Sequence, residues 1–247
     1  MDRMLYIAMS GAKENMTGVA LRANNLANAN TTGFKADLQQ ARAMQSYGDG
    51  LPTRVFSLTE SPGQNYAAGS LVTTERSLDV AVQGQGWIAV ADDEGNEAYT
   101  RNGSLQMTAE GMLQTNTGQP VLGDGGPIFL PIPVEKIEIG GDGTIMVRPQ
   151  GAPAQAMEIV DRIRLVNPPN EEVERGTDGL FRRKDGFDAV LAAEVRLTVG
   201  ALEKSNVNPI EEMTQMIALQ RNYDMNVKMM KTAEENAQRS ESLMRIS

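Results

Sequence analysis

Residues 5–26 read LYIAMSGAKENMTGVALRANNL. Their apolar positions recur at alternating spacings of four and three residues, the a/d repeat that leaves one apolar seam along a helix. The positions of this N-terminal seam are Leu5, Met9, Ala12, Met16, Val19, Ala23 and Leu26. The pattern predicts a helix that Asp2 caps, that runs to about Ala29, and that ends in the cluster Asn30-Thr31-Thr32-Gly33.

A second seam lies near the other end of the sequence. The positions of this C-terminal seam are Met213, Met216, Tyr223, Val227 and Met230, with Gln220 in phase between them. Asn208-Pro209 supplies a capping side chain followed by a first-turn proline, so the helix is predicted to begin there. We therefore expect residues 1–33 and 203–247 to hold long helices of coiled-coil type that meet each other or neighbouring molecules.

Two interpretations of the seams stay open from this pattern alone. An ordinary helix pair within one chain accounts for them, and so does contact with neighbouring chains. The chain contains 15 methionines, several of them in the C-terminal helix. A flexible thioether suits contact with non-equivalent neighbours, but it is also a routine filler of helical cores.

The residues between the two helices have a different character. Residues 34–75 are polar and interrupted by glycine and proline, which predicts an extended linker with room for one hairpin. Residues 76–202 alternate apolar and polar side chains, as in Leu78, Val80 and Val82, which is typical of strands. Asn102-Gly103, Asp124-Gly125, Asp142-Gly143, Asp178-Gly179 and Asp185-Gly186 are predicted hairpin turns. Because many prolines would interrupt regular ladders, we expect an irregular, barrel-like β domain within a mixed α and β fold.

Composition excludes several kinds of function. The chain has 247 residues with no cysteine and no histidine, which removes thiol nucleophiles, imidazole bases and the usual transition-metal ligands. We therefore expect no cofactor and no metal. The net charge of −9 lies between residues 31 and 202, since the charges of the two ends cancel. An acidic chain disfavours nucleic acid as a partner.

The N-terminal residues need a separate comparison with targeting segments. Arg3 followed by the uncharged run from Met4 to Ala12 mimics a short signal peptide, but the helical pattern continues across the place where cleavage would occur. We expect an uncleaved helix there. No apolar run in the sequence is long enough to span a bilayer as a helix.

A carboxylate-dependent glycosidase is the alternative function from another class. Two carboxyl groups suffice for that chemistry, and the acidic clusters that suggest it are Asp92, Asp93, Glu94, Glu171, Glu172 and Glu174. These residues lie in predicted polar turns without apolar walls that would raise a pKa. Solvated loops explain them better than an active site does, so we expect no enzymatic activity and no catalytic residue.

The segment from Ala23 to Lys35 reads ANNLANANTTGFK. Asparagines are poor helix formers, so their presence at the end of a helix predicts specific hydrogen bonds for their amides. The segment resembles the N-terminal signature of the bacterial flagellar rod and hook proteins, A-N-N-[LI]-A-N-x-x-T-x-G-[FY]-[KR]. The residues that match it most distinctively are Asn24, Asn25, Leu26, Asn28, Thr31, Gly33, Phe34 and Lys35. We call this segment the N-terminal motif.

Three further blocks resemble the same family in the expected order. They are Ser77–Trp87 (SLDVAVQGQGW), Tyr99–Gly103 (YTRNG) and Leu202–Asn208 (LEKSNVN), the last leading into the C-terminal helix. The opening, the short middle and the C-terminal helix look most like the proximal-rod proteins that adjoin the distal rod. Distal-rod proteins are the nearest rival, whereas hook proteins normally carry a larger outer domain.

The resemblance implies a structural subunit of the flagellar basal-body rod that transmits torque. It implies partners among the proximal- and distal-rod proteins, copies of the same chain, and the flagellar export apparatus in transit. It also implies a location in the rod within the periplasm. Neither seam has a partner nearby in the sequence. We therefore expect the helices to fold as the subunit assembles, with the seam side chains providing affinity for neighbouring subunits.

Overall fold

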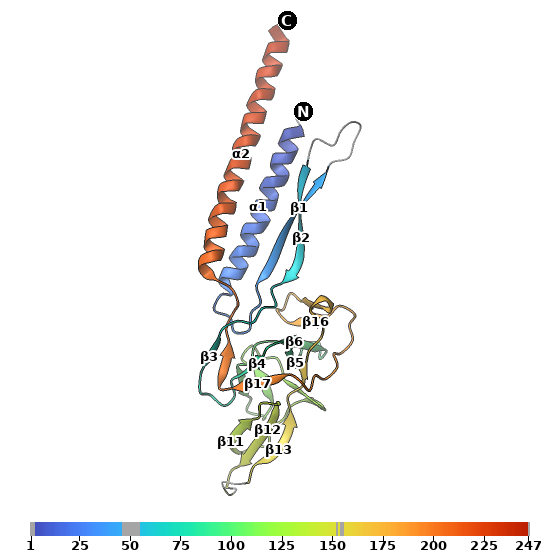
Figure 1. Ribbon diagram of the computed structural model, residues 1–247, viewed down its shortest axis with the longest axis vertical. Helices are drawn as coiled ribbons and strands as arrows, with labels where there is room; N and C mark the ends of the chain where they lie inside the picture. Colours follow the sequence, from blue (N-terminus) through green and yellow to red (C-terminus); the bar gives the residue numbers. More distant parts are fainter. Residues whose placement is uncertain (1–2, 46–54, 152, 154–155, 247) are drawn as a thin grey trace. The chain divides into compact units, whose positions relative to one another are not determined.

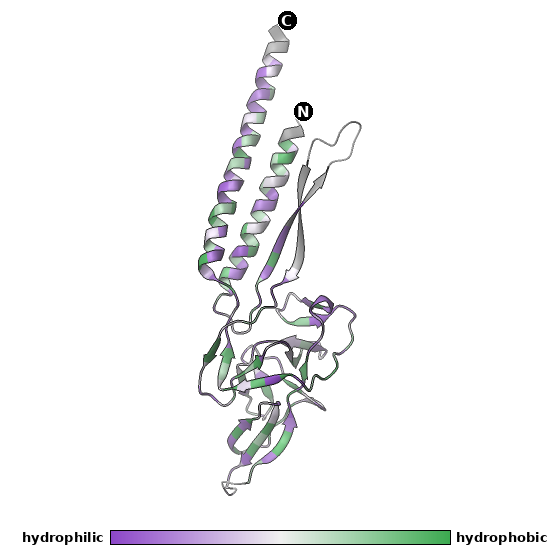
Figure 2. Cartoon of the chain, viewed as in Figure 1, coloured by the Kyte–Doolittle hydropathy of each residue, from purple (hydrophilic) through white to green (hydrophobic). Residues whose placement is uncertain are grey.

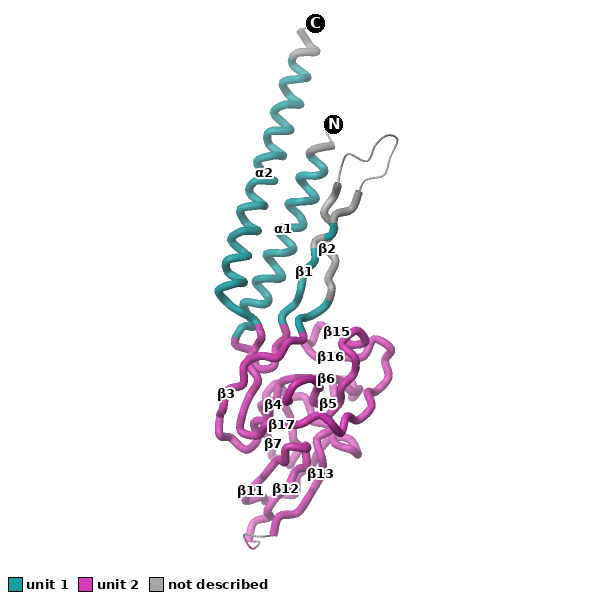
Figure 3. The backbone as a smooth tube through the Cα atoms, viewed as in Figure 1, with its two compact units in different colours: residues 1–29, 36–65, 207–247 teal, residues 30–35, 66–206 magenta. Residues whose placement is uncertain are grey.

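The computed structural model describes residues 3–45, 55–151, 153 and 156–246, and they form two compact units. Unit 1 comprises residues 1–29, 36–65 and 207–247, and unit 2 comprises residues 30–35 and 66–206. Figure 3 draws unit 1 in teal and unit 2 in magenta. Asp2, the expected cap of the first helix, lies outside the described residues. The predicted fold class is confirmed in its coarse form, with a helix towards each end and a β-rich middle.

Unit 1 is built from two helices and one hairpin (Figure 1). Helix α1 spans Arg3–Ala27 and helix α2 spans Pro209–Ile246, so α1 has 25 residues and α2 has 38. The two helices lie side by side in unit 1. α1 ends at Ala27, before the expected end near Ala29, and the i→i−4 pattern gives way to a tighter turn in which the amide of Ala29 bonds to the carbonyl of Leu26 at 3.2 Å.

The cap of α2 follows the sequence prediction. Asn208 Oδ1 accepts a hydrogen bond from the amide of Ile210 at 3.2 Å, and Pro209 takes the first helical position. This satisfies one of the amides that a helix start leaves without an internal partner.

A hairpin occupies much of the segment that was expected to be an extended linker. Strand β1 (Asp37–Gln45) pairs antiparallel with strand β2 (Val55–Gln64), with Asp37 opposite Gln64 and Gln45 opposite Val55. The hairpin belongs to unit 1 and contacts α1. The remaining residues of the segment, from Tyr66 onward, belong to unit 2 and include strand β3 (Leu71–Thr73).

Unit 2 holds several small antiparallel sheets. Besides β3, its elements are β4 (Val80–Gln83), β5 (Trp87–Ala91), β6 (Glu97–Thr100), β7 (Leu105–Met107), β8 (Leu113–Thr115), β9 (Leu122–Gly123), β10 (Gly126–Pro127), β11 (Val134–Ile139), β12 (Thr144–Pro149), β13 (Glu158–Arg162), β14 (Leu165–Val166), the 3₁₀ turn η1 (Asn170–Glu172), β15 (Val173–Arg175), β16 (Phe181–Arg183), β17 (Arg196–Val199) and β18 (Ala201–Glu203). The largest sheet has the strand order β14-β5-β6-β16-β15, and a second runs β11-β12-β13. Four strand pairs complete the unit, β17 with β4, β18 with β3, β7 with β8, and β9 with β10.

The expectation of a barrel-like domain is wrong in its finer form. Among the described residues the strands form separate sheets of two, three and five strands, and none closes on itself. The chain leaves its ladders at Pro131, Pro133 and Pro168, each of which lies outside the strands and lacks the amide that a continuous ladder needs. The prolines in the sequence indicated that the strand ladders would be interrupted. The structure has a set of short sheets rather than an irregular barrel.

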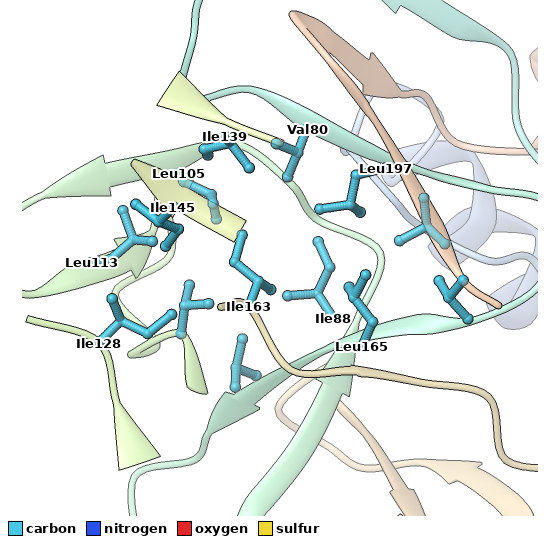
Figure 4. Close-up of a cluster of buried hydrophobic side chains, with 14 of the residues drawn as sticks. Val80, Ile88, Leu105, Leu113, Ile128, Ile139, Ile145, Ile163, Leu165 and Leu197 are labelled. Atoms are coloured by element: carbon cyan, nitrogen blue, oxygen red, sulfur yellow. The ribbon is translucent and has the colours of Figure 1, made fainter. Parts of the chain in front are cut away.

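A shared hydrophobic cluster holds the sheets of unit 2 together. Figure 4 shows side chains from several strands directed toward one another, among them Val80, Ile88, Leu105 and Ile163, which are 0–1% exposed. A second cluster contains Trp87, Tyr99, Val166 and Phe181, and the rings of Trp87 and Phe181 lie 4.4 Å apart. Unit 2 therefore has an apolar core made from its own residues.

The glycines of the predicted turns divide into two groups. Gly143, Gly179 and Gly186 adopt positive φ angles of 73–89°, as tight turns require. Gly103 and Gly125 were expected to do the same, but neither has a positive φ. Gly103 is needed for a close approach instead, since a Cβ there would lie 1.7 Å from the carbonyl oxygen of Val80, whereas a Cβ on Gly125 would meet nothing within 4 Å.

Candidate functional site

The contact between α1 and α2 in unit 1 includes small and polar side chains. A Cβ built on Gly11 would lie 3.1 Å from Asn226 Nδ2, and one on Gly18 would lie 3.0 Å from Leu219 Cδ1. Ala8 and Ala12 are also buried, at 1% and 5% exposure. Glycine and alanine here let the helix backbones approach closely, so this contact buries little large apolar surface.

These contacts lie one position before the predicted seams. Gly11 and Gly18 precede Ala12 and Val19 on α1, and Leu219 and Asn226 precede Gln220 and Val227 on α2. One residue corresponds to a rotation of about 100° on a helix of 3.6 residues per turn. A search for apolar periodicity could not find this stripe, because most of its members are glycine or polar.

The predicted seam residues are consequently distributed around the edge of the helix pair. Ala12 is buried, and Leu5, Val19, Leu26, Met216, Tyr223, Val227 and Met230 are half-buried. Ala23 is exposed, and the exposed methionines are Met9 at 51%, Met16 at 66% and Met213 at 45%. Within unit 1 several of the larger seam side chains therefore stay in contact with solvent.

Further large apolar side chains of the two helices are exposed outside the seams. They are Tyr6, Ile210, Ile217, Met225 and Met229, with exposures of 39–72%. Figure 2 shows hydrophobic and hydrophilic residues interspersed along both helices. Isolated exposed apolar residues are ordinary, but a helix pair that carries this many presents a surface suited to further helices. We call the exposed members of this set together with Met9, Met16 and Met213 the outer apolar surface.

A buried polar group joins both helices to the hairpin of unit 1. Asn25 is fully buried, its Nδ2 donates to the carbonyl of Asp37 at 3.0 Å, and its Oδ1 accepts from the amide of Asp37 at 2.9 Å. From α2, Glu212 forms an ion pair with Arg22 at 3.1 Å and lies 3.4 Å from Asn25 Nδ2. An unpaired buried amide or carboxylate is costly, so this group favours one register of α1, α2 and β1 over neighbouring registers.

A second buried polar group lies in unit 2 and contains three charged side chains. Lys35 Nζ contacts Glu203 Oε1 at 2.6 Å, and Arg101 Nη1 contacts Glu203 Oε2 at 3.0 Å. Their side chains are only 1–4% exposed. Burial lowers the pKa of Lys35, although the hydrogen bond that Lys35 donates to Glu203 opposes that shift. We call Lys35, Arg101 and Glu203 the ion cluster.

Neighbouring groups make further contacts with the ion cluster, although Arg101 Nε has no hydrogen-bond partner among the described residues. Lys35 Nζ also donates to the carbonyl of Ala67 at 2.9 Å, and Glu203 Oε1 accepts from the amide of Gly69 at 2.9 Å. Arg101 Nη2 donates to the carbonyl of Gly84 at 2.8 Å, and its guanidinium lies 5.3 Å from the ring centre of Trp87. Such a cluster is costly to break, because each remaining charge would be left buried.

Residues 30–35, which we call the strap, run beside the segment that leads into α2. The amide of Gly33 donates to the carbonyl of Glu203 at 2.8 Å, and the amide of Asn206 donates to the carbonyl of Phe34 at 3.3 Å. Gly33 has φ of +71°, and a Cβ there would lie 2.4 Å from the carbonyl carbon of Arg101. Arg175 lies over the ring of Phe34 at 4.9 Å. Glycine is therefore required at position 33 for both conformation and space.

The N-terminal motif is thus divided between the two units. Asn24, Asn25, Leu26 and Asn28 belong to unit 1, where Asn28 Nδ2 donates to the carbonyl of Asn24 at 3.0 Å. The other motif residues, Thr31, Gly33, Phe34 and Lys35, belong to the strap in unit 2, where the carbonyl of Thr31 accepts from the amide of Phe34 at 3.3 Å. The prediction that the amides make specific hydrogen bonds is confirmed for Asn25.

Three of the four sequence blocks supply the ion cluster, and the remaining block contacts it through Arg101. Lys35 comes from the N-terminal motif, Gly84 and Trp87 from the second block, Arg101 from the third, and Glu203 from the fourth. Sequence reasoning quoted these residues but assigned no role to Arg101 or Glu203. The available signal was a charged residue within each block, which acquires meaning only when the fold brings the blocks together.

The acidic clusters that suggested a glycosidase lie in two different parts of unit 2. A cavity of about 790 Å³ in unit 2 is lined by the turn from Asp92 to Glu97 together with Asp178, Arg182 and Phe187, among others. Glu171, Glu172 and Glu174 are not among its lining residues. Arg182 pairs with Asp92 at 2.8 Å and with Asp178 at 2.5 Å.

The two carboxyl groups paired with Arg182 are held ionised. Burial raises the pKa of Asp92, but the hydrogen bonds from Arg182 and the backbone amides outweigh it and lower that pKa below its usual value. The hydrogen bond from Arg182 likewise lowers the pKa of Asp178. A glycosidase needs a carboxyl group that retains its proton near neutral pH, and these two groups have the opposite tendency.

The described part of the chain offers no candidate for a metal site or for a membrane-spanning helix. No set of three or more acidic side chains is arranged so as to hold a metal ion. No described helix combines the length and hydropathy needed to cross a bilayer.

Three family models match the chain in order. The model described as "Flagella basal body rod protein" matches residues 5–35, "Flagellar hook protein FlgE/F/G D1 domain" matches residues 81–147, and "Flagellar basal body rod FlgEFG protein C-terminal" matches residues 198–243. The first and last matches cover most of the two helices, and the second lies within unit 2.

Individual relatives match the whole chain. The flagellar basal-body rod proteins FlgF of Escherichia coli K12 and of Salmonella typhimurium are each 42% identical to it over all of both chains. FlgF of Caulobacter vibrioides is 33% identical, again over all of both chains. FlgG of Buchnera aphidicola from Schizaphis graminum is 31% identical over 97% of this chain. The chain therefore belongs to the family of flagellar basal-body rod proteins.

Proposed function

We propose that this chain is a structural subunit of the proximal part of the flagellar basal-body rod, where its helices pack against neighbouring subunits. The observation that carries the proposal is the outer apolar surface. Within unit 1 the two helices contact each other through small and polar residues and leave Met9, Met16 and Ile217 more than half exposed. Burial of one such side chain contributes about 1.5–3 kcal/mol, so contact with neighbouring helices is strongly favoured.

The likeness to FlgF proteins supports the proximal rather than the distal assignment. Identity is 42% to the FlgF proteins of E. coli and S. typhimurium, 28–33% to four further FlgF proteins, and 30–31% to two FlgG proteins of Buchnera aphidicola, so the support comes from the first two relatives. The alternative that the chain is a distal-rod subunit is therefore less well supported.

Folding of unit 1 is proposed to be coupled to assembly. Unit 2 has its own apolar core, whereas α1 and α2 bury few large apolar side chains in one chain. Long helices with so little apolar contact do not offset the conformational entropy of ordering them. In the free subunit the helices would stay largely unfolded, pass through the export apparatus without a cleaved signal peptide, and fold against other rod subunits in the periplasm.

The torque-bearing role follows from the same proposal. Rod proteins of the proximal and distal segments and further copies of this chain would supply the neighbouring helices. Each helix would then be held along its length by several contacts. A subunit embedded in this way transmits torque mechanically and needs neither cofactor nor catalytic group.

Incorporation into the rod tests the proposal directly. In a strain that lacks the gene, a copy with an epitope tag inserted in the exposed turn Asp124–Gly125 of unit 2 should restore motility and co-purify with basal bodies. Cross-linking should place it beside both rod segments. A tagged chain that restores motility but is absent from purified basal bodies would contradict a structural role. Release of products from peptidoglycan fragments by the purified chain would instead favour the glycosidase alternative.

A further inference from the structure

The strap and the start of α2 are joined by a dense set of contacts within unit 2. Lys35 at the end of the strap shares Glu203 with Arg101, and Glu203 lies six residues before Pro209, where α2 begins. Two backbone hydrogen bonds, from Gly33 to Glu203 and from Asn206 to Phe34, run alongside the ion pair. The segment that connects to α1 and the segment that leads into α2 are therefore bound to each other inside unit 2.

The contacts matter because a long stretch of chain connects the strap to the rest of unit 2. Residues 36–65, including the hairpin of β1 and β2, connect the strap to the rest of unit 2 and belong to unit 1. If the strap were released while unit 1 is unfolded, α1 would be joined to unit 2 only through residues 30–65. A flexible chain of that length has an r.m.s. end-to-end distance of roughly 30 Å.

We propose that the strap and the ion cluster form a clamp, with Gly33 and Lys35 as its positioning residues. The clamp holds the end of α1 near the start of α2 before the helices fold. The clamp rests on the proposed coupled folding, since it acts while the helices have no contacts of their own. It raises the effective concentration of one helix near the other, which falls roughly as the −3/2 power of the length of a flexible tether. The helices therefore enter the rod as a pair.

The residues of the clamp suit this role better than a purely stabilising one. Three buried charges in one cluster are a weak source of stability compared with apolar packing, but they are highly selective for one geometry. Lys35 can be removed from the cluster while Glu203 keeps its pair with Arg101. Gly33 can be changed without altering any charge.

Two variants should release the strap by different means. Lys35→Met removes the ammonium group, and Gly33→Ala places a Cβ against the backbone of Arg101. The matched control is Lys136→Met, which removes an exposed ion pair with Glu138 at 2.5 Å elsewhere in unit 2. The chain has no cysteine, so spin labels on cysteines at the exposed positions Asn30 and Lys204 report one distance without background labelling.

Pulsed electron paramagnetic resonance on the free, full-length subunit measures the distance between the labels. The parent and Lys136→Met chains should give one narrow distribution, and both strap variants should give a broad one extending over tens of ångströms, as expected for a flexible tether of about 36 residues. Fluorescence of Trp87, the one tryptophan of the chain, should show unit 2 folded in all four proteins.

Three results would overturn the clamp. The first is a narrow distribution in both strap variants while their helices exchange amide hydrogens freely. The second is loss of Trp87 burial in both variants, because the strap would then be part of the folding core rather than a releasable connection. The third is protection of both helices in the free parent chain, which also refutes coupled folding. Amide exchange on the same samples distinguishes that third result from the other two.

Discussion

Replacing Met16 with aspartate is expected to block incorporation into the rod while leaving the free subunit unchanged. Met16 is 66% exposed on α1, so the substitution disturbs no described contact within one chain. In the rod, the proposed contact would lose about 1.5–3 kcal/mol of apolar burial and would acquire a charge without a partner. A combined cost above about 3 kcal/mol lowers incorporation at least about 100-fold. Motility and the amount of the chain in purified basal bodies measure this effect.

The adjacent residue supplies a matched control for this prediction. Thr17 is also exposed, but its side chain is polar and lies about 100° further around the helix. Thr17→Asp should be incorporated at a level within a few-fold of the parent chain. Ile217→Asp on α2, at 55% exposure in the parent, should behave like Met16→Asp. Normal motility of both Met16→Asp and Ile217→Asp would show that the outer apolar surface does not mediate assembly.

Replacing Glu203 with alanine is expected to destabilise unit 2 by about 3–5 kcal/mol. The carboxylate is shared by Lys35 and Arg101, whose side chains are 1% and 4% exposed, so both charges would be left buried without their counterion. The amide of Gly69 would also lose its acceptor. Urea unfolding followed by Trp87 fluorescence measures the loss, because that side chain is 2% exposed and contacts Arg101.

An exposed glutamate of unit 2 provides the comparison. Glu138 pairs with Lys136, and their side chains are 43% and 53% exposed. Glu138→Ala should cost less than about 1 kcal/mol, as exposed ion pairs usually do. If the midpoint of Glu203→Ala shifted no further than that of Glu138→Ala, the ion cluster would have no structural importance and the clamp would lose its basis.

The helices and the strand-rich middle could be predicted because they depend on local patterns. The cap at Asn208-Pro209 and the alternation around Val80 are visible in a few neighbouring residues, and the structure confirms the cap and a strand at Val80–Gln83. The hairpin of β1 and β2 was harder to predict, because its polar strands do not alternate clearly in the sequence. The absence of a closed barrel among the described strands depends on how distant strands pair, which local periodicity does not encode.

The residues that position the helices were only partly predictable. Gly11, Gly18 and Asn25 contact α2 or β1 but are small or polar, so apolar periodicity selected their neighbours Ala12, Val19 and Leu26 instead. Glu203 and Arg101 are far apart in the sequence, and nothing local indicates that they share a buried ion pair. The assembly role of the seam residues stays a prediction, since it concerns contacts between chains.

Hydrogen exchange on the purified, monomeric chain tests coupled folding most directly. Amides should be read separately for residues 3–29, 76–202 and 208–246. Coupled folding predicts rapid amide exchange in the first and last ranges, which hold α1 and α2. It predicts strong protection in the middle range, which contains the apolar core of unit 2. Strong protection of all three ranges in a monomer would contradict it, because the helices would then be folded before any other rod subunit is present.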